Sequence, residues 1–157
     1  MITDNYDASE GGCTCGAVRY VVTATPLIVH CCHCHWCQRE TGSAFVINAV
    51  IEKMHVHLTK GEVSVIHTPS LSGKGQKIVR CPHCQIALWS HYAGSSKLTF
   101  LRVGTLDHPE LMPPDIHIYT ESKQPWVTLP EDAVTRPQFY ETETVLSRDS
   151  LHRLAAL

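Results

Sequence analysis

The sequence predicts a mainly β protein made of short antiparallel strands. Three observations support this fold class: runs of β-branched residues, turn residues between the runs, and closely spaced cysteines where runs end. A chain of 157 residues is the size of one domain and can bury a substantial core. We therefore expect one domain over residues 1–157, with a core at about 10–140 and a C-terminal tail at 141–157.

Strands are expected wherever β-branched or alternating apolar residues recur. The predicted ranges are 17–24, 27–31, 44–51, 55–58, 63–68, 77–80, 86–92 and 98–103. Gly61, between Lys60 and Glu62, predicts a turn that joins 55–58 to 63–68 as a hairpin. One helical turn is expected at 37–41 and a short terminal helix at 150–157. The range 70–76 is expected to be a loop, and 107–137 an ordered coil against the sheet.

Charge and hydropathy exclude two classes of partner. The 13 Lys and Arg residues are scattered against 15 Asp and Glu, so no basic face for nucleic acid is expected. No stretch approaches the roughly 18 apolar residues of a membrane-spanning helix. The polar residues 1–7 lack the features of a secretory signal, so the protein is expected in the cytoplasm. In that compartment clustered cysteines indicate metal or redox chemistry more often than disulfides.

Closely spaced cysteines are the strongest functional signal in the chain. Of the eight cysteines, seven fall into clusters: Cys13 with Cys15, Cys81 with Cys84, and the triplet Cys32, Cys34 and Cys37. This spacing is typical of thiolate metal ligation, with zinc as the default metal. The remaining residue, Cys31, interrupts the triplet spacing and is interpreted as a buried free thiol or a strand residue that points away.

The two cysteine pairs can close over one zinc ion. Cys81-x-x-Cys84 is the usual turn that directs two sulfurs at one metal. Cys13 and Cys15 can act together because alternate residues of a strand face the same side. Four thiolates leave no open coordination position, so this site is expected to be structural. A redox dithiol is the weaker interpretation, because no βαβ pattern surrounds Cys81.

The triplet can converge on one ion if the end of a strand turns into a helix near Cys37. Three protein ligands would leave a position for water or substrate, as in catalytic zinc sites. The alternative is that His33, His35 or a distant histidine supplies a fourth ligand and closes the site. The sequence leaves both interpretations open.

Several motifs resemble those of the glutathione-dependent formaldehyde-activating enzyme family, which includes centromere protein V-like proteins. The matching segments are 13–20, 32–42, 80–84 and 104–109, together with His117, Ile118 and Trp126. The resemblance implies a compact antiparallel β-tent fold with two zinc ions per chain. It implies a structural zinc held by Cys13, Cys15, Cys81 and Cys84, and a catalytic zinc held by Cys32, Cys34 and Cys37. The implied activity is the condensation of glutathione with formaldehyde, classed with carbon–sulfur lyases.

Two residues depart from the family pattern beside the second cysteine pair. Gln85 follows Cys84 where the family usually has glycine, and Arg80 precedes Cys81 where it usually has an aromatic residue. If residue 85 adopts a left-handed conformation, a non-glycine residue costs about 1 kcal/mol or more. These changes concern the turn at the structural site.

The leading hypothesis is a zinc enzyme that activates a thiol such as glutathione for addition to formaldehyde or a similar small carbonyl. Arg39 is the candidate for binding a substrate carboxylate, and a solvated surface position is the alternative. His33 and His35 are candidates for moving the proton, or are simply exposed. Trp36 either lines the pocket or fills the core, and the core is favoured. The alternatives are a non-catalytic, zinc-stabilised binding module and a thiol redox switch.

Overall fold

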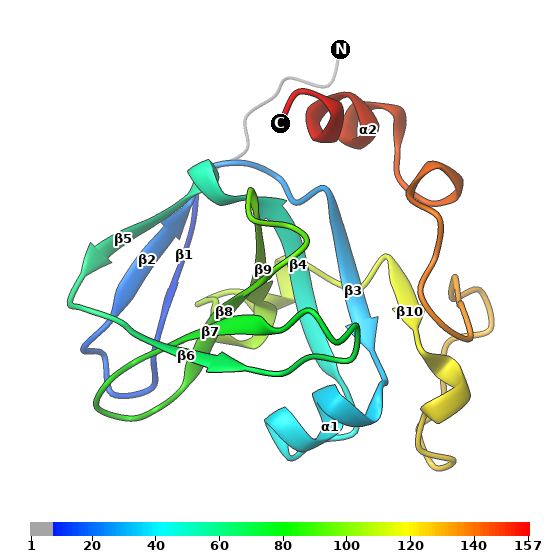
Figure 1. The fold of residues 1–157 in the computed structure, drawn as a ribbon, viewed down its shortest axis with the longest axis horizontal. Helices are drawn as coiled ribbons and strands as arrows, with labels where there is room; N and C mark the ends of the chain where they lie inside the picture. Colours follow the sequence, from blue (N-terminus) through cyan, green and yellow to red (C-terminus); the bar gives the residue numbers. More distant parts are fainter. Residues whose placement is uncertain (1–7) are drawn as a thin grey trace.

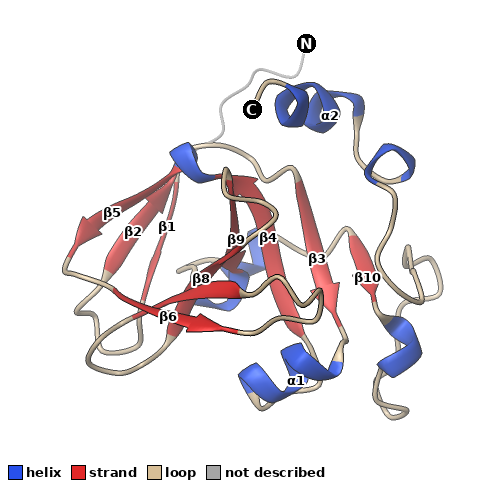
Figure 2. Cartoon of the chain, in the orientation of Figure 1, coloured by secondary structure: helices blue, strands red, loops and turns tan. Residues whose placement is uncertain are grey.

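In residues 8–157, which the computed structural model describes, strands form most of the regular structure and group into two sheets (Figures 1 and 2). The prediction that residues 1–7 carry no secretory signal concerns residues outside this range. Within the described part, no helix is both long and apolar enough to cross a membrane. The predicted mainly β fold class is confirmed.

The smaller sheet runs in the order β1-β2-β5, with antiparallel pairing throughout. Its strands are β1 (Ser9–Gly12), β2 (Arg19–Val22) and β5 (Val56–Lys60). The sequence did not predict β1, because its Ser-Glu-Gly-Gly sequence contains no β-branched residue. The turn between β1 and β2 carries Cys13 and Cys15.

The larger sheet runs in the order β10-β3-β4-β9-β8-β7-β6. Its strands in chain order are β3 (Ile28–Cys32), β4 (Val46–Glu52), β6 (Ser64–Thr68), β7 (Gln76–Arg80), β8 (Ala87–Tyr92), β9 (Leu98–Arg102) and β10 (Ile116–Ile118). All of these except β10 lie within two residues of the predicted ranges. The turn between β7 and β8 carries Cys81 and Cys84.

The predicted hairpin between 55–58 and 63–68 is wrong. β5 pairs with β2 and β6 pairs with β7, so the chain passes from one sheet to the other near Gly61. Gly61 has a φ of 79°, and a Cβ added there would lie 2.1 Å from the carbonyl oxygen of Ala17. The glycine therefore marks a sharp turn and a close approach, but a local turn signal does not determine which strands pair.

The segment predicted as coil at 107–137 contains β10, which pairs in parallel with β3. A strand of three residues is too short to be recognised from periodicity, and its partner lies far away in the sequence. β10 lies beside β3 at the edge of the larger sheet (Figure 1). This pairing sets His117 opposite Cys31.

Helix α1 (His35–Thr41) follows directly after β3 and begins within the cysteine triplet. Cys34 is its N-cap, and the Cys34 sulfur accepts a hydrogen bond from the backbone N–H of Cys37. Gly42 ends the helix in a left-handed conformation, and its N–H bonds the carbonyl of Gln38 at 2.8 Å. The predicted strand-to-helix transition is thus present, two residues earlier than expected.

Helix α2 (Arg148–Ala155) forms the predicted terminal helix, with Ser147 as its N-cap. Short 3₁₀ turns complete the chain at η1 (Lys53–His55), η2 (Val103–Thr105), η3 (Pro109–Leu111), η4 (Thr120–Ser122) and η5 (Thr142–Thr144). The Ser150 hydroxyl donates to the carbonyl oxygen of Leu27 at 2.7 Å, which fixes α2 beside the start of β3.

The larger sheet buries side chains on both of its faces. One hydrophobic cluster lies between the larger and the smaller sheet. In it, the rings of Tyr20 of β2 and Trp89 of β8 meet edge to face, with their centroids 5.6 Å apart. A second cluster contains Ile28 and Val50 with the three triplet cysteines, and Tyr140 covers it from the C-terminal segment. Because side chains alternate along a strand, β3 contributes Val29 to the first cluster and Ile28 to the second.

Candidate metal centres and active site

The structure brings together the sulfurs of the two cysteine pairs. The Sγ atoms of Cys13, Cys15, Cys81 and Cys84 lie within 4.8 Å of one another. The Cys13–Cys15 distance is 3.5 Å and the Cys15–Cys81 distance is 3.7 Å. Sulfurs bound tetrahedrally to zinc at 2.3 Å would be about 3.8 Å apart. The donor set and the spacing therefore fit a closed four-thiolate zinc site.

A turn, and not a strand, directs Cys13 and Cys15 to the same point. The N–H of Gly16 bonds the carbonyl of Cys13 at 3.1 Å, and Gly16 has a φ of 75°. The prediction that both cysteines lie on one face of a strand was therefore wrong, although the sulfurs do converge. Burial acts to raise the pKa of Cys13, but the N–H of Val18 and the neighbouring thiols lower it to about 6.

The two departures from the family pattern interact with each other at the second pair. Gln85 has a φ of 62°, in the left-handed region expected for glycine, and its N–H bonds the carbonyl of Cys81 at 3.0 Å. The Arg80 guanidinium donates to the carbonyl oxygen of Gln85 at 3.0 Å and pairs with Glu40 of α1. Arg80 thus links the turn of one cysteine cluster to the helix that carries part of the other.

The triplet sulfurs converge where β3 passes into α1. Cys32, Cys34 and Cys37 are buried, and their Sγ atoms lie within 4.8 Å of one another. Among residues 8–157, no histidine nitrogen belongs to this group of ligand atoms. The donor set fits a zinc ion held by three thiolates with a fourth position available.

Mutual hydrogen bonding already separates the protonation states of the triplet. Cys34 accepts hydrogen bonds from the Cys32 and Cys37 thiols, and these bonds lower its pKa to about 3. Hydrogen bonds with Cys32 first and Cys34 second raise the pKa of Cys37, and the bond with Cys34 leads the rise in the pKa of Cys32 to about 12. The directions of these shifts make Cys34 the cysteine of the triplet that most readily becomes a thiolate, the form that binds a cation.

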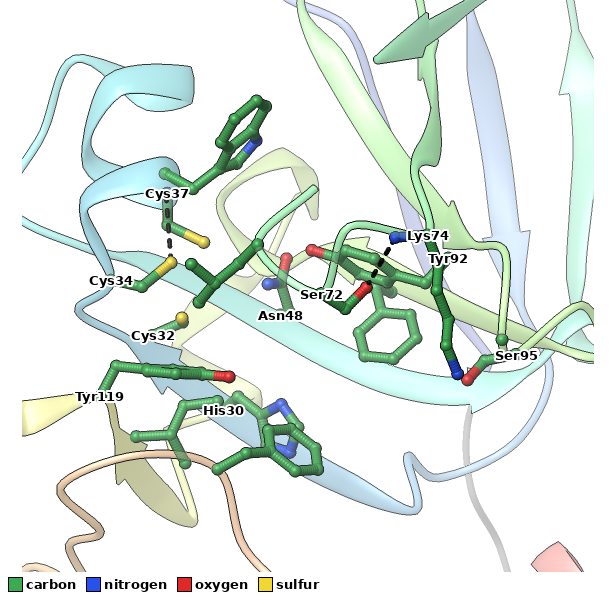
Figure 3. A pocket seen from close by; sticks show the side chains of 16 residues that line it. His30, Cys32, Cys34, Cys37, Asn48, Ser72, Lys74, Tyr92, Ser95 and Tyr119 are labelled. Carbon is green, nitrogen blue, oxygen red and sulfur yellow. Dashed lines mark hydrogen bonds between the residues drawn. The ribbon is translucent and has the colours of Figure 1, made fainter. Parts of the chain in front are cut away.

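A cavity of about 450 Å³ opens beside the triplet. Figure 3 shows the three sulfurs on one side of this pocket and Lys74 with Ser95 on the opposite side. Aromatic side chains line much of the remaining wall: Trp36, Tyr92, Phe100, Tyr119 and Phe139. Such a cavity has the size and apolar lining of a small-molecule site with a few polar groups.

The structure places Arg39 and Trp36, which have predicted roles, and adds Lys74 to the pocket. Arg39 is exposed on α1 and does not line the pocket, whereas Lys74, from the loop after β6, does. Trp36 was expected in the core, but it is partly exposed and lines the pocket while packing against the second cluster. No pattern in the sequence indicated Lys74, because a loop far from the triplet along the chain brings it to the pocket.

The histidines next to the triplet lie away from the sulfurs. His35 is exposed, and His33 is fully buried, where desolvation lowers its pKa to about 4. The His33 Nε2 atom lies 3.5 Å from the Cys31 sulfur and 3.0 Å from Nδ1 of His117. Neither His33 nor His35 lines the pocket, so their predicted part in proton movement stays a prediction.

The chain is thus a β-rich protein with two cysteine clusters suited to zinc, one of which opens onto an apolar pocket. The model of the glutathione-dependent formaldehyde-activating enzyme family matches residues 8–122, and the chain belongs to this family. The resemblance found in the sequence is confirmed.

Two relatives illustrate the range of similarity. A Halomonas elongata protein named "putative glutathione-dependent formaldehyde-activating enzyme" is 28% identical over 125 residues, which make up 76% of this chain and 80% of that protein. The crystal structure of a Rhodobacter sphaeroides protein has a TM-score of 0.50 at 20% identity and covers 62% of this chain and 87% of that chain. At this level of identity the second likeness concerns the fold.

Proposed function

We propose that this protein is a zinc-dependent enzyme that adds a small thiol, glutathione or a relative of it, to formaldehyde or a similar small carbonyl. The observation that carries the proposal is the position of the triplet sulfurs in the wall of a pocket of about 450 Å³. Family membership supports glutathione and formaldehyde as the reacting pair. In the reaction a carbon–sulfur bond forms, the thiol loses its proton, and the carbonyl oxygen gains one.

In this proposal Cys32, Cys34 and Cys37 hold one zinc ion, and Cys13, Cys15, Cys81 and Cys84 hold a second. Zinc at the triplet would lower the pKa of a substrate thiol bound in its fourth position. The thiol would then be a thiolate nucleophile at neutral pH. The reverse reaction breaks the same carbon–sulfur bond, as in carbon–sulfur lyases. Thiolate ligation needs reduced cysteines, which supports a cytoplasmic setting.

The remaining pocket residues position the substrate and exclude water. The Asn48 side chain lines the pocket, and its Oδ1 accepts a hydrogen bond from Arg102 at 2.6 Å. This bond leaves the Asn48 amide nitrogen to donate to the carbonyl oxygen of the acceptor. The aromatic wall lowers the local dielectric constant, which strengthens that hydrogen bond as negative charge develops on the oxygen.

The test is the rate at which glutathione and formaldehyde combine, with the uncatalysed rate subtracted. Cys34→Ser should lower kcat/KM at least about 100-fold, because a zinc ligand is lost. His57→Ala is the control, since His57 is exposed on β5 and outside the pocket. The proposal fails if folded Cys34→Ser keeps the activity of the unmodified protein; a metal-stabilised binding module would then be the better description.

A second test compares Lys74 and Arg39 as the residue that binds a carboxylate of the substrate. We expect Lys74 to bind a glutathione carboxylate, because it lines the pocket opposite the sulfurs (Figure 3). Lys74→Met should raise KM for glutathione about tenfold with little change in kcat, as for the loss of one charge-assisted hydrogen bond. Arg39→Met is the matched variant: a rise in KM there, and none for Lys74→Met, would favour the residue predicted from the sequence.

A further inference from the structure

We propose that Cys31, His33 and His117 form a further metal site, which takes Zn²⁺ and is separate from both cysteine clusters. Their ligand atoms lie within 4.8 Å of one another. The inference is independent of the proposed reaction, because none of the three residues lines the pocket.

The alternation of side chains along one strand separates this site from the triplet. His30 and Cys32 of β3 line the pocket, so Cys31 between them faces the other side of the sheet. Just after the strand, Nε2 of His33 lies 3.5 Å from the Cys31 sulfur. Strand β10 lies beside β3 (Figure 1). The two strands pair in parallel, with His117 directly opposite Cys31. Neighbouring strands thus contribute the three donors to one point.

The distances fit zinc coordination. Nε2 of His33 lies 3.0 Å from Nδ1 of His117 and 3.5 Å from the Cys31 sulfur. Two imidazole nitrogens on a tetrahedral zinc ion would be about 3.3 Å apart, and a nitrogen and a sulfur about 3.6 Å. Small adjustments of side-chain torsion would therefore place an ion among the three atoms.

A hydrogen-bonded arrangement does not satisfy both contacts at Nε2 of His33. The Nε2 atom of His33 carries either one proton or one lone pair, yet two polar groups lie within bonding distance of it. Cys31 and His33 are almost fully buried, so water does not supply the missing partner. A cation accepts the lone pairs of all three donors at once.

One thiolate and two imidazoles are ligands that zinc prefers. His117 is partly exposed and provides the side from which an ion can enter, while the Phe45 ring lies against His33 at 5.4 Å. The bound ion would fasten β10 to β3. Because Ile118 and Tyr119 follow His117 and line the pocket, it would also hold one wall of the pocket in place.

The test is anomalous diffraction at the zinc edge on crystals of the full chain, loaded with zinc and dialysed against metal-free buffer. We expect a peak between Cys31, His33 and His117 in the unmodified protein. His117→Asn should remove that peak and lower the bound zinc by one ion per chain, because asparagine keeps a hydrogen-bonding atom near Nδ1 but is a poor zinc ligand. His35→Ala should leave both measurements unchanged.

Cys31→Ala is the second variant, which changes little volume and should also lose the peak. Peaks at the two cysteine clusters in the same crystals show that each variant is folded, so this site is judged separately from them. The proposal is overturned if dialysed unmodified protein shows no peak here, which would indicate an adventitious ion only. It is also overturned if the peak survives in both variants.

Discussion

At the scale of single residues, the turn after Cys81 concentrates backbone strain. Gln85 occupies a left-handed conformation that favours glycine, with a φ of 62°. Its side-chain amide donates to the carbonyl oxygen of Pro82 at 2.9 Å, which offsets part of the cost. The metal-binding turn therefore keeps its geometry with a glutamine, because hydrogen bonds replace the freedom that glycine would supply.

Substitutions at position 85 separate strain from hydrogen bonding. Gln85→Gly should be about 1 kcal/mol more stable than Gln85→Ala, because both lose the side-chain bond but only glycine relieves the strain. Urea unfolding measures the difference. Gly42→Ala is the control, since Gly42 has a φ of 65° with no heavy atom within 4 Å of an added Cβ, and should lose a similar amount. Equal stability of the two position-85 variants would contradict this account.

The candidate site divides into residues that the sequence could predict and residues that it could not. Cys32, Cys34 and Cys37 were predicted because they are close together in the sequence, and at such short spacing their side chains can reach one point. Lys74 and His117 were missed as site residues because their positions depend on strand pairing over long separations. For His117, the sequence contained one signal: Cys31 and His33 are two residues apart and could share a metal ion with a distant histidine.

At the scale of elements, an ion pair fastens α2 to the larger sheet. Arg153 donates to both carboxylate oxygens of Glu52, at 2.8 and 2.6 Å, and to the carbonyl oxygen of Thr25 at 2.9 Å. The Glu52 side chain is 6% exposed. Burial acts to raise the pKa of Glu52, but the bonds from Arg153, a backbone N–H and the nearby positive charge together hold the pKa below its ordinary value of 4.5.

The attachment of α2 should therefore weaken in acid. Because the folded-state pKa of Glu52 is depressed, its contribution is complete above about pH 4.5 and is lost as the pH falls through the folded-state value. Arg153→Met should cost about 1.5–3 kcal/mol at pH 7, with the difference shrinking below pH 4.5. Chemical unfolding at several pH values measures this. Arg148→Met, exposed on the same helix, is the control, and a pH-independent difference would refute the assignment.

Individual strands were easier to predict than their partners. The runs of apolar and β-branched residues in β4 and β9 located both strands within two residues. The sequence placed β5 and β6 in one hairpin, whereas they belong to different sheets. Local propensity acts over a few residues, but strand pairing depends on which apolar faces meet in the core, and single-sequence patterns do not contain that information.

At the scale of the whole molecule, the four-cysteine cluster joins the two sheets. Cys13 and Cys15 lie between β1 and β2 of the smaller sheet, while Cys81 and Cys84 lie between β7 and β8 of the larger. Packing of Tyr20 against Trp89 connects the same two sheets. A metal ion at this cluster would close the end of that interface, so its binding free energy would contribute directly to folding.

Removal of metal should therefore lower the thermal stability of the chain. Zinc at about 1,000 times its Kd contributes about 4 kcal/mol. For a protein of this size that corresponds to roughly 8–16 °C in Tm. Calorimetry with and without chelator measures the shift. Cys81→Ser should abolish most of this shift in Tm, whereas Cys34→Ser should retain most of it. An unchanged Tm in protein verified to have lost its metal would contradict this role.

Strand β3 carries different residues to the two faces of the sheet, with His30 and Cys32 lining the pocket and Cys31 between them facing the other side. Its register is consequently as important as its composition. Insertion or deletion of one residue before Cys31 would exchange the two sets, presenting Cys31 to the pocket and withdrawing Cys32 from it. Natural variants of this protein should therefore tolerate substitutions along β3 far more readily than any change in its length.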